Sequence, residues 1–432
     1  MQPSQYMITQ PTDGVWTELA SDQHLQLQLQ LDALKPQITD DAAVPTMAVK
    51  ANIGVEGLAR SAGSKVLEAD HPVVDAPVVA ALKTAGYVVA GTTNMHELAF
   101  GITSENADYG PVRLPGHPTR SAGGSSGGSS VAVAEGSVDI ALGTDTGGSV
   151  SIPASHCGIY GLRPSTGRWP GAGVTGLSWT RDTAGVFARN LAQLQVVDAI
   201  ITGQSAAKHS AERLRLGVPT QLLEALDPHT EQVVNLALEK LEQHAVLVEV
   251  DYAPILEQLT DAEQPVVLWE SRRLLASVAA QTFDMAPQAG FEHLAKHVGS
   301  PDVASLLHAE LANPVSPDSY ASAQRSIMQA RSGYDQLLAK HKLDALVFPT
   351  TPAPAPLLGS EGLVEHLGEP APIFPLYTRN TAQGTMLGAP MLTLPLPVPS
   401  HELPVGVTLQ GARFEDRQLL TIAATVDAAC SA

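Results

Sequence analysis

Two Gly/Ser clusters hold the side chains of this sequence that are best suited to chemistry. One is GGSSGGSS at 123–130 and the other is TDTGGS at 144–149, with an apolar segment between them. A flexible Gly/Ser linker would remain polar throughout, so we expect these clusters to belong to a packed structure. Because glycine lacks a Cβ, such clusters can turn successive N–H groups toward a bound phosphate or oxyanion.

The sequence disfavours nucleotide binding, which leaves serine chemistry as the expected function of the two Gly/Ser clusters. A phosphate loop needs a lysine before its last Ser/Thr, which neither cluster has, and the GxGxxG fingerprint is missing between a strand and a helix. The run GGSSG matches the GxSxG nucleophile elbow, which would make Ser125 the nucleophile. An elbow follows a hydrophobic strand, however, and the preceding residues 116–122, GHPTRSA, have the composition of a loop.

A second serine motif lies further along the chain. Ser205 and Lys208 match the SxxK motif of penicillin-binding enzymes. They lie in the polar stretch TGQSAAKHSAER, which we expect to be an exposed connection, so this alternative is weaker.

Lys50 is a candidate base for the serines. It lies in MAVKANI, an otherwise apolar run in which a buried lysine requires a reason. A serine hydroxyl is a weak nucleophile until a base takes its proton, and lysine can be that base only when it is uncharged. Burial would therefore have to lower the pKa of Lys50 well below its usual value of about 10.4.

These residues together resemble the amidase signature family. Its pattern has GGSSGG, a fixed gap and GTDxGGS, with a lysine upstream, and the similarity continues through 153–165 and 181–185. The resemblance implies that Ser149 is the nucleophile, Ser125 a bridging serine on a cis peptide bond, and Lys50 the base. Ser125 would accept the proton of Ser149, donate to Lys50, and later return a proton to the leaving amine.

The resemblance also implies an oxyanion hole, in which losing one donor typically costs about 100- to 1000-fold in rate. Its donors would be the backbone N–H groups of Thr146, Gly147, Gly148 and Ser149. We expect Asp145 to orient this loop through hydrogen bonds rather than to transfer protons.

Substrate contacts are expected from the loop NMHELAFG at 94–101. In the family this loop faces the substrate, so Ala99 and Phe100 are candidate substrate-binding residues together with Ser125. An equally open alternative is a capped helical turn with Phe100 in the core.

The expected substrate class comes from similarity to particular members of the family. Within the family, the segments at 93–113 and 348–395 are most similar to indoleacetamide and mandelamide hydrolases. Many members have an arginine two positions after the nucleophile, where this sequence has Ser151, and this difference disfavours an acidic substrate. We therefore expect hydrolysis of a neutral small or aryl amide to an acid and ammonia or an amine, with no cofactor.

Three alternatives remain open. One is hydrolysis of urea-like or carbamate substrates, as in allophanate and urethane hydrolases. Another is an amidotransferase subunit that supplies ammonia to mischarged tRNA, and the third is a binding protein that lost the chemistry. The intact Lys50, Ser125 and Ser149 argue against the third alternative.

The fold that must position these residues is expected to be α/β. Length alone would suggest two or three domains for 432 residues. The resemblance instead implies a single α/β/α domain over 1–432, with a twisted mixed β-sheet flanked by helices. Its parts would be an N-terminal helical segment at 1–45, a catalytic core at 46–190, a variable helical section at 191–340, and a C-terminal part of the core at 341–432.

Periodicity places the individual elements. We expect helices at 75–85, 129–135, 191–201, 230–244, 262–283, 320–340 and 416–429. We expect strands around Lys50 and at 87–90, 138–142, 345–348, 391–394 and 406–410.

Composition limits the partners and the compartment. The net charge of −19 disfavours a nucleic-acid or anionic-membrane partner, both of which require basic patches. No apolar run approaches the roughly 18 residues of a membrane span, and no signal peptide is recognisable, so we expect a cytoplasmic protein. Two cysteines are too few for a disulfide framework, and we take the 14 histidines as scattered and expect no metal. If a homodimer forms, we expect section 191–340 to supply its contacts.

Overall fold

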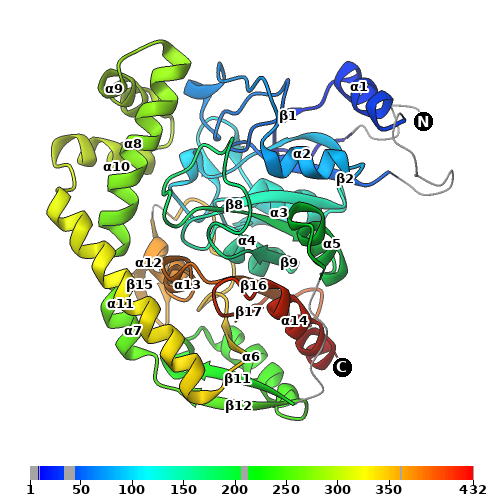
Figure 1. Ribbon diagram of the computed structural model, residues 1–432, viewed down its shortest axis with the longest axis vertical. Coiled ribbons are helices and arrows are strands. Elements are labelled where there is room, and N and C mark those ends of the chain that lie inside the picture. Colours follow the sequence, from blue (N-terminus) through cyan, green and yellow to red (C-terminus); the bar gives the residue numbers. More distant parts are fainter. Residues whose placement is uncertain (1–7, 9, 34–43, 206–212, 361, 432) are drawn as a thin grey trace.

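The computed structural model describes residues 8, 10–33, 44–205, 213–360 and 362–431. Their central element is an eleven-stranded mixed sheet, which runs through the middle of the molecule (Figure 1). Its strands, in spatial order, are β1 (Trp16–Leu19), β3 (Val88–Thr93), β2 (Thr46–Lys50), β8 (Ile140–Asp145), β10 (Thr183–Ala188), β9 (Tyr160–Arg163), β16 (Met391–Pro395), β17 (Gly406–Gln410), β13 (Ala345–Pro349), β11 (Leu214–Pro219) and β12 (Ala245–Val250).

Helices surround the sheet, and α8 to α11 line one side of the molecule, at the left of Figure 1. Short two-stranded sheets add β4 (Glu105–Asn106) with β5 (Gly110–Pro111), β6 (Arg113–Leu114) with β7 (His117–Ser121), and β14 (Leu363–His366) with β15 (Glu369–Pro372). The helices are α1 (Asp22–Ala33), α2 (Pro77–Thr84), α3 (Gly127–Ala134), α4 (Ser151–Cys157), α5 (Leu191–Thr202), α6 (Pro228–Leu241), α7 (Ala253–Leu259), α8 (Glu263–Phe283), α9 (Pro287–His297), α10 (Pro301–Ala312), α11 (Pro317–His341), α12 (Ile373–Thr378), α13 (Ala382–Leu387) and α14 (Asp416–Ser431).

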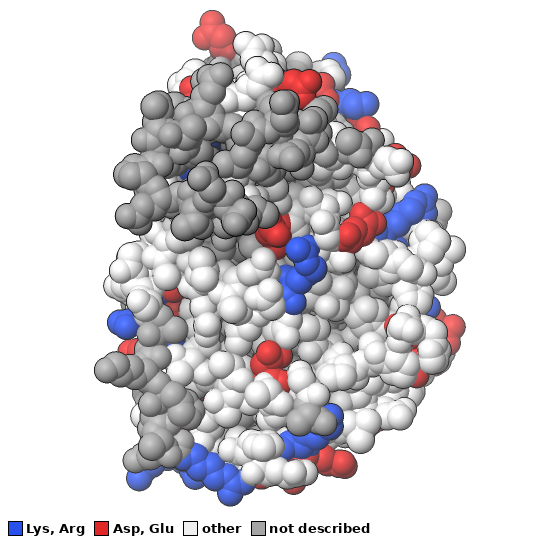
Figure 2. Space-filling view, turned by 90° about the vertical axis from the view of Figure 1, so that its right-hand side faces the viewer, with Lys and Arg blue, Asp and Glu red and all other residues white. Residues whose placement is uncertain are grey.

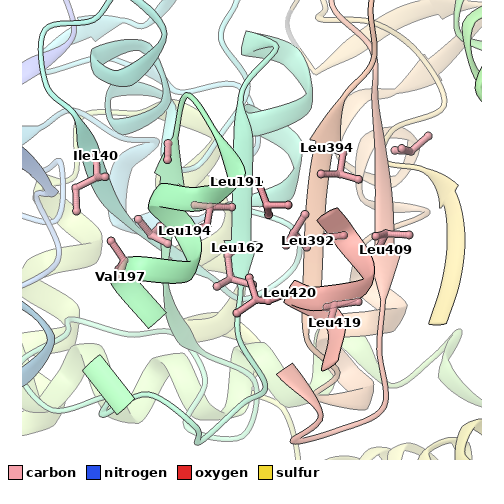
Figure 3. Packing of buried hydrophobic residues seen from close by; sticks show 14 of the residues in the cluster. Ile140, Leu162, Leu191, Leu194, Val197, Leu392, Leu394, Leu409, Leu419 and Leu420 are labelled. Atoms are coloured by element: carbon pink, nitrogen blue, oxygen red, sulfur yellow. The ribbon is translucent and has the colours of Figure 1, made fainter. Parts of the chain in front are cut away.

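The largest apolar cluster lies between the sheet and helices α2, α5, α6 and α14. Figure 3 shows Leu191 and Leu194 of α5, with Leu419 of α14, packing toward Leu162 of β9 and Leu392 of β16. These side chains are almost completely removed from water. Full burial of a leucine is worth about 1.5–3 kcal/mol, so this layer is a main source of stability for the centre of the sheet.

Strand alternation decides on which face of the sheet Lys50 lies. In β2, Met47 and Val49 join the large cluster, whereas Ala48 joins the cluster on the opposite face, with α3 and α4. Successive residues of a strand point to opposite faces, so Lys50 points to the same face as Ala48. The lysine therefore faces the side of the sheet that carries the two Gly/Ser segments.

The α/β fold predicted from the sequence is confirmed: one mixed sheet is flanked by helices. The predicted helices at 191–201, 230–244, 262–283 and 320–340 correspond to α5, α6, α8 and α11. Antiparallel pairs join β8, β10, β9, β16, β17 and β13 in succession, while β2 runs parallel to both β3 and β8. The sheet thus places β2 and β8 side by side.

Three sequence expectations are corrected by the structure. The N-terminal segment 1–45 is not purely helical, since Trp16–Leu19 forms β1, which pairs with β3. The stretch 116–122 is not an irregular loop, because His117–Ser121 forms β7. It is a polar hairpin strand, and for this reason the hydrophobic pattern did not indicate it. The section 191–340 is not helical throughout, since it contains β11 and β12, which pair in parallel with each other and join β13.

None of the helices in the described ranges is both long and apolar enough to cross a bilayer. Figure 2 shows the face at the right-hand side of Figure 1, where basic and acidic side chains are scattered among uncharged ones.

Candidate active site

Lys50 ends β2 in a completely buried position. Its Nζ donates hydrogen bonds to Ser125 Oγ at 2.7 Å and to Thr144 Oγ1 at 2.8 Å, with the Thr144 carbonyl at 3.4 Å. Parallel pairing of β2 with β8 explains the approach, because Thr144 lies near the end of the neighbouring strand. The structure thus brings Lys50 and Ser125 together, as the sequence predicted.

The environment of Lys50 favours its uncharged form. Burial lowers the pKa of Lys50 from 10.5 to about 7, although the nearby Asp145 and Asp182 carboxylates act in the opposite direction. The cost of removing an ammonium group from water exceeds the attraction to these two groups. Near neutral pH, a large fraction of Lys50 is therefore able to accept a proton.

Ser125 lies directly before α3 and is completely buried. The Gly124–Ser125 peptide bond is cis. A side chain at Gly124 would approach the Ile102 carbonyl carbon and the Ser104 nitrogen to 2.9 Å, so only glycine fits there. The Ser125 carbonyl accepts a hydrogen bond from the His96 N–H at 3.0 Å, which joins this turn to the loop that follows β3.

Ser149 lies between β8 and α4, with 7% of its surface exposed. We call residues 145–150 the nucleophile loop. Gly148 has φ +129°, and a Cβ there would collide with Thr381, so glycine is required. Thr381 Oγ1 also donates to the Gly147 carbonyl at 2.8 Å. Within the described ranges, no hydrogen bond joins the Ser149 hydroxyl to Ser125.

Asp145 holds the nucleophile loop through backbone amides. Its Oδ1 accepts the Gly148 N–H at 3.0 Å and its Oδ2 accepts the Val150 N–H at 2.7 Å. This corrects one predicted oxyanion donor, because the Gly148 amide is already occupied by a carboxylate. In the part of the chain that the structure describes, the amides of Thr146, Gly147 and Ser149 have no acceptor.

A buried arginine pairs with Asp145, and sequence reasoning did not single it out. Arg163 Nε lies 3.2 Å from Asp145 Oδ1, and both side chains are completely buried. The guanidinium group also donates to the carbonyls of Ala389 at 2.8 Å and Arg181 at 2.7 Å. The only signal for it was its position in GLRPS, inside the stretch that resembles the family.

Two more acidic residues flank the nucleophile loop. Thr146 Oγ1 donates to Asp182 Oδ1 at 2.6 Å, and burial of this carboxyl group raises its pKa. Glu263, the first residue of α8, pairs with Arg181 at 3.1 Å. The Glu263 carboxylate lies 3.4 Å from the point that a Cβ on Gly147 would occupy. Glu263 was not predicted, because nothing in the sequence indicates that α8 reaches this loop.

The predicted substrate-binding residues Ala99 and Phe100 lie in a short 3₁₀ turn, Glu97–Ala99, and just after it. Both are partly buried and pack against an apolar cluster that includes Leu98 and Phe291. The alternative that places Phe100 against the core therefore describes its contacts in this structure. Its contact with a substrate stays a prediction.

Ser151 lies in the first turn of α4. Its hydroxyl is buried and has no hydrogen-bond partner within the described ranges. The cation that pairs with Asp145 comes instead from Arg163 on β9. Lys208, of the alternative SxxK motif, lies outside the described residues.

The sequence analysis did not identify one pair of neighbouring histidines. His293 and His297 are four residues apart on α9, with ring centroids 4.2 Å apart. Among the described residues, no group of three or more His, Cys, Asp or Glu side chains could hold a metal ion.

Comparisons with known proteins show the family of the chain. A family model described as amidase matches residues 15–420. An indoleacetamide hydrolase from Agrobacterium vitis is 34% identical over 390 residues, which cover 89% of this chain and 83% of that protein. A mandelamide hydrolase from Pseudomonas putida is 35% identical over 404 residues, which cover 87% of this chain and 76% of that protein.

Solved structures give the same result. A crystal structure of an amidase aligns with a TM-score of 0.83 and 31% identity, covering 96% of this chain and 92% of the other. The native peptide amidase from Stenotrophomonas maltophilia aligns with a TM-score of 0.72 and 28% identity, covering 90% of this chain and 83% of the other.

Proposed function

The chain belongs to the amidase family and hydrolyses amide C–N bonds, and from this premise we propose that it does so through an acyl-enzyme on Ser149. Ser125 transfers protons and Lys50 is the base. The observation that carries this assignment is the 2.7 Å hydrogen bond between Lys50 Nζ and Ser125 Oγ, made by a lysine whose pKa burial lowers to about 7.

The first half-reaction forms an ester. Ser149 Oγ attacks the amide carbonyl carbon while its proton passes to Ser125 Oγ, and the Ser125 proton passes to uncharged Lys50. The backbone amides of Thr146, Gly147 and Ser149 stabilise the oxyanion. Because these donors are fixed before the reaction, no solvent has to reorganise as the charge develops. The C–N bond then breaks, and the leaving nitrogen takes a proton from Ser125, which is replaced from the Lys50 ammonium group.

The second half-reaction restores the enzyme. Water attacks the ester carbonyl and gives up its proton through Ser125 to Lys50. The C–O bond to Ser149 breaks, the Ser149 oxygen regains its proton, and the carboxylic acid leaves. One amide and one water are consumed, and one acid and one ammonia or amine are released.

The substrate we propose is a neutral small or aryl primary amide. Two features support this class: the relatives that act on indoleacetamide and mandelamide are about a third identical along most of this chain, and Ser151 supplies no cation for a substrate carboxylate. Urea-like and carbamate substrates remain the second candidate, because the same acyl transfer would cleave them.

A substrate panel with adduct mapping tests the proposal. Aryl and alkyl primary amides, anilides, carbamates and ureas are scored for release of ammonia or amine, and a fluorophosphonate-labelled sample is mapped by peptide mass. We expect the highest kcat/KM for an aryl primary amide and an adduct on Ser149. An adduct on Ser125 would support the nucleophile elbow instead, and faster turnover of ureas would shift the assignment to the second candidate.

A further inference from the structure

The charged side chains around the nucleophile loop include more carboxyl groups than guanidinium groups. Asp145 is paired with Arg163, and Glu263 is paired with Arg181. Asp182 adds a further carboxyl group, both oxygens of which accept hydrogen bonds. Arg163 and Arg181, the two guanidinium groups beside the loop, are thus each paired with a carboxylate. Among the described residues around the loop, neither of these cations is free to bind an anionic substrate.

Glu263 is more exposed than the paired side chains Arg181, Asp145 and Arg163. Its side chain keeps 25% of its surface exposed, whereas Arg181 keeps 1% and the Asp145–Arg163 pair none. Only Oε1 of Glu263 has a partner within the described ranges, so Oε2 is left as an acceptor. The carboxylate also adjoins Gly147, where a Cβ would lie in contact with Oε1 at 3.4 Å.

Arg181 is held in place independently of Glu263. Its Nη2 also donates to Thr385 Oγ1 at 2.8 Å, and its carbonyl accepts from Arg163 Nη2. Its Nε and Nη1 atoms are buried and have no hydrogen-bond partner among the described residues. Removing the charge of Glu263 would therefore leave Arg181 without its ion-pair partner beside the nucleophile loop, with Asp182 as the remaining carboxyl group that acts on it.

We propose that Glu263 sets the charge preference of the enzyme, excluding acyl groups that carry a carboxylate and favouring neutral or cationic ones. This inference rests on the proposed function, since it concerns the acyl group bound next to Ser149. A negative charge near Gly147 repels a substrate carboxylate, and it does so more strongly in a site that excludes water. Glu263 comes from α8, so this selectivity would be supplied by the helical section and not by the residues that perform the chemistry.

The test compares three matched aryl amides on the wild type and on Glu263→Gln. Phenylacetamide is neutral, and its 4-carboxy and 4-aminomethyl derivatives carry opposite charges. We expect Glu263→Gln to raise kcat/KM for the carboxylate, relative to phenylacetamide, about tenfold and mainly through a lower KM. For the 4-aminomethyl amide we expect this ratio to fall. Raising the salt concentration should reduce the wild-type discrimination, as screening requires.

Asp261→Asn is the matched control, because Asp261 is an exposed carboxylate two residues before Glu263. It should leave all three ratios within twofold of the wild type. Unchanged ratios in Glu263→Gln, or equal changes in both variants, would overturn the inference.

Inactivation by sulfonyl fluorides separates this inference from the proposed function. Second-order rate constants are measured for benzenesulfonyl fluoride and its 4-carboxy derivative on the same variants. A tenfold gain for the carboxylate reagent in Glu263→Gln supports the role of Glu263 even if no amide of the panel is cleaved. Cleavage of neutral amides with no such gain leaves the function standing and rejects the role of Glu263.

Discussion

Lys50, Ser125 and Asp145 are completely buried on or beside the central strands, whereas Glu263 and Asp302 reach the same region from helices α8 and α10 and remain partly exposed. The first group makes hydrogen bonds to backbone amides and to one another. The second group contacts the surrounding loops through an ion pair of Glu263 with Arg181 and a 2.8 Å hydrogen bond between Asp302 and His96. A rigid sheet thus holds the groups that need precise geometry, while the helices supply charges that can differ without disturbing it.

The largest effect should come from the sheet region, at Lys50. We expect Lys50→Ala to reduce kcat by about 1000-fold or more at neutral pH, because general base catalysis alone contributes about 100- to 10,000-fold. Single-turnover kinetics with an aryl amide measures this loss. Circular dichroism should show a folded protein, since the variant removes a buried amine, and near-wild-type activity would mean that the base lies elsewhere.

Asp145→Ala tests the support of the nucleophile loop. It removes the acceptor of two backbone N–H groups and leaves Arg163 buried without its carboxylate. Breaking a buried ion pair typically costs about 3–5 kcal/mol, so we expect a clearly lower unfolding midpoint together with about a 100-fold lower kcat. Asp145→Asn, which keeps the volume and one acceptor, should lose less of both. Equal activity of Asp145→Ala and the wild type would contradict an orienting role.

The pH profile reports on Lys50 in the intact enzyme. Its pKa of about 7 means that protonation removes the base as the pH falls below that value. We expect kcat/KM to fall about tenfold per pH unit below pH 7 and to level off above it. Glu263→Gln should keep the same midpoint, because burial together with Asp145 and Asp182 sets the pKa of Lys50. A flat profile between pH 5 and 8 would argue against an uncharged lysine as the base.

The smallest effect on catalysis is expected within the helical region, at Glu270. This buried residue of α8 accepts hydrogen bonds from Ser178 Oγ at 2.5 Å, Thr180 Oγ1 at 3.0 Å and Tyr320 Oη at 2.7 Å. Hydrogen bonds to a charged group are worth about 1.5–3 kcal/mol each, so Glu270→Gln should lower the free energy of unfolding by about that amount. We expect kcat to change less than threefold. Denaturant titration and steady-state kinetics measure the two quantities, and Tyr320→Phe serves as a milder control.

The sequence predicted the sheet region better than the helical region, and the reason is physical. Close backbone approach demands particular glycines at fixed spacing, so the two Gly/Ser motifs indicated packed turns, and their resemblance to the family identified Ser125 and Ser149 within them. Lys50 was recognisable because a lysine in an apolar strand is costly. The contact of Lys50 with Thr144 then follows from the neighbouring strands β2 and β8.

What could not be predicted depends on contacts between distant segments. Arg163 and Glu263 have no local pattern that indicates their partners, because each partner is fixed by the packing of another element. The occupied amide of Gly148 likewise requires the side-chain rotamer of Asp145. Strands β11 and β12 were missed because they lie between long helices, where the helical period dominates the sequence.

The order of the strands has a consequence for how this protein is made. β16 and β17 come from the last tenth of the chain, yet they lie between β9 and β13 in the middle of the sheet. Until residues 391–395 have been synthesised, the segments that hold Lys50, Ser125 and Ser149 are complete, but β9 lacks its neighbour on one side. An open strand edge of this kind invites pairing with other chains. A chain that lacks residues 391–410 would therefore expose the edge of β9.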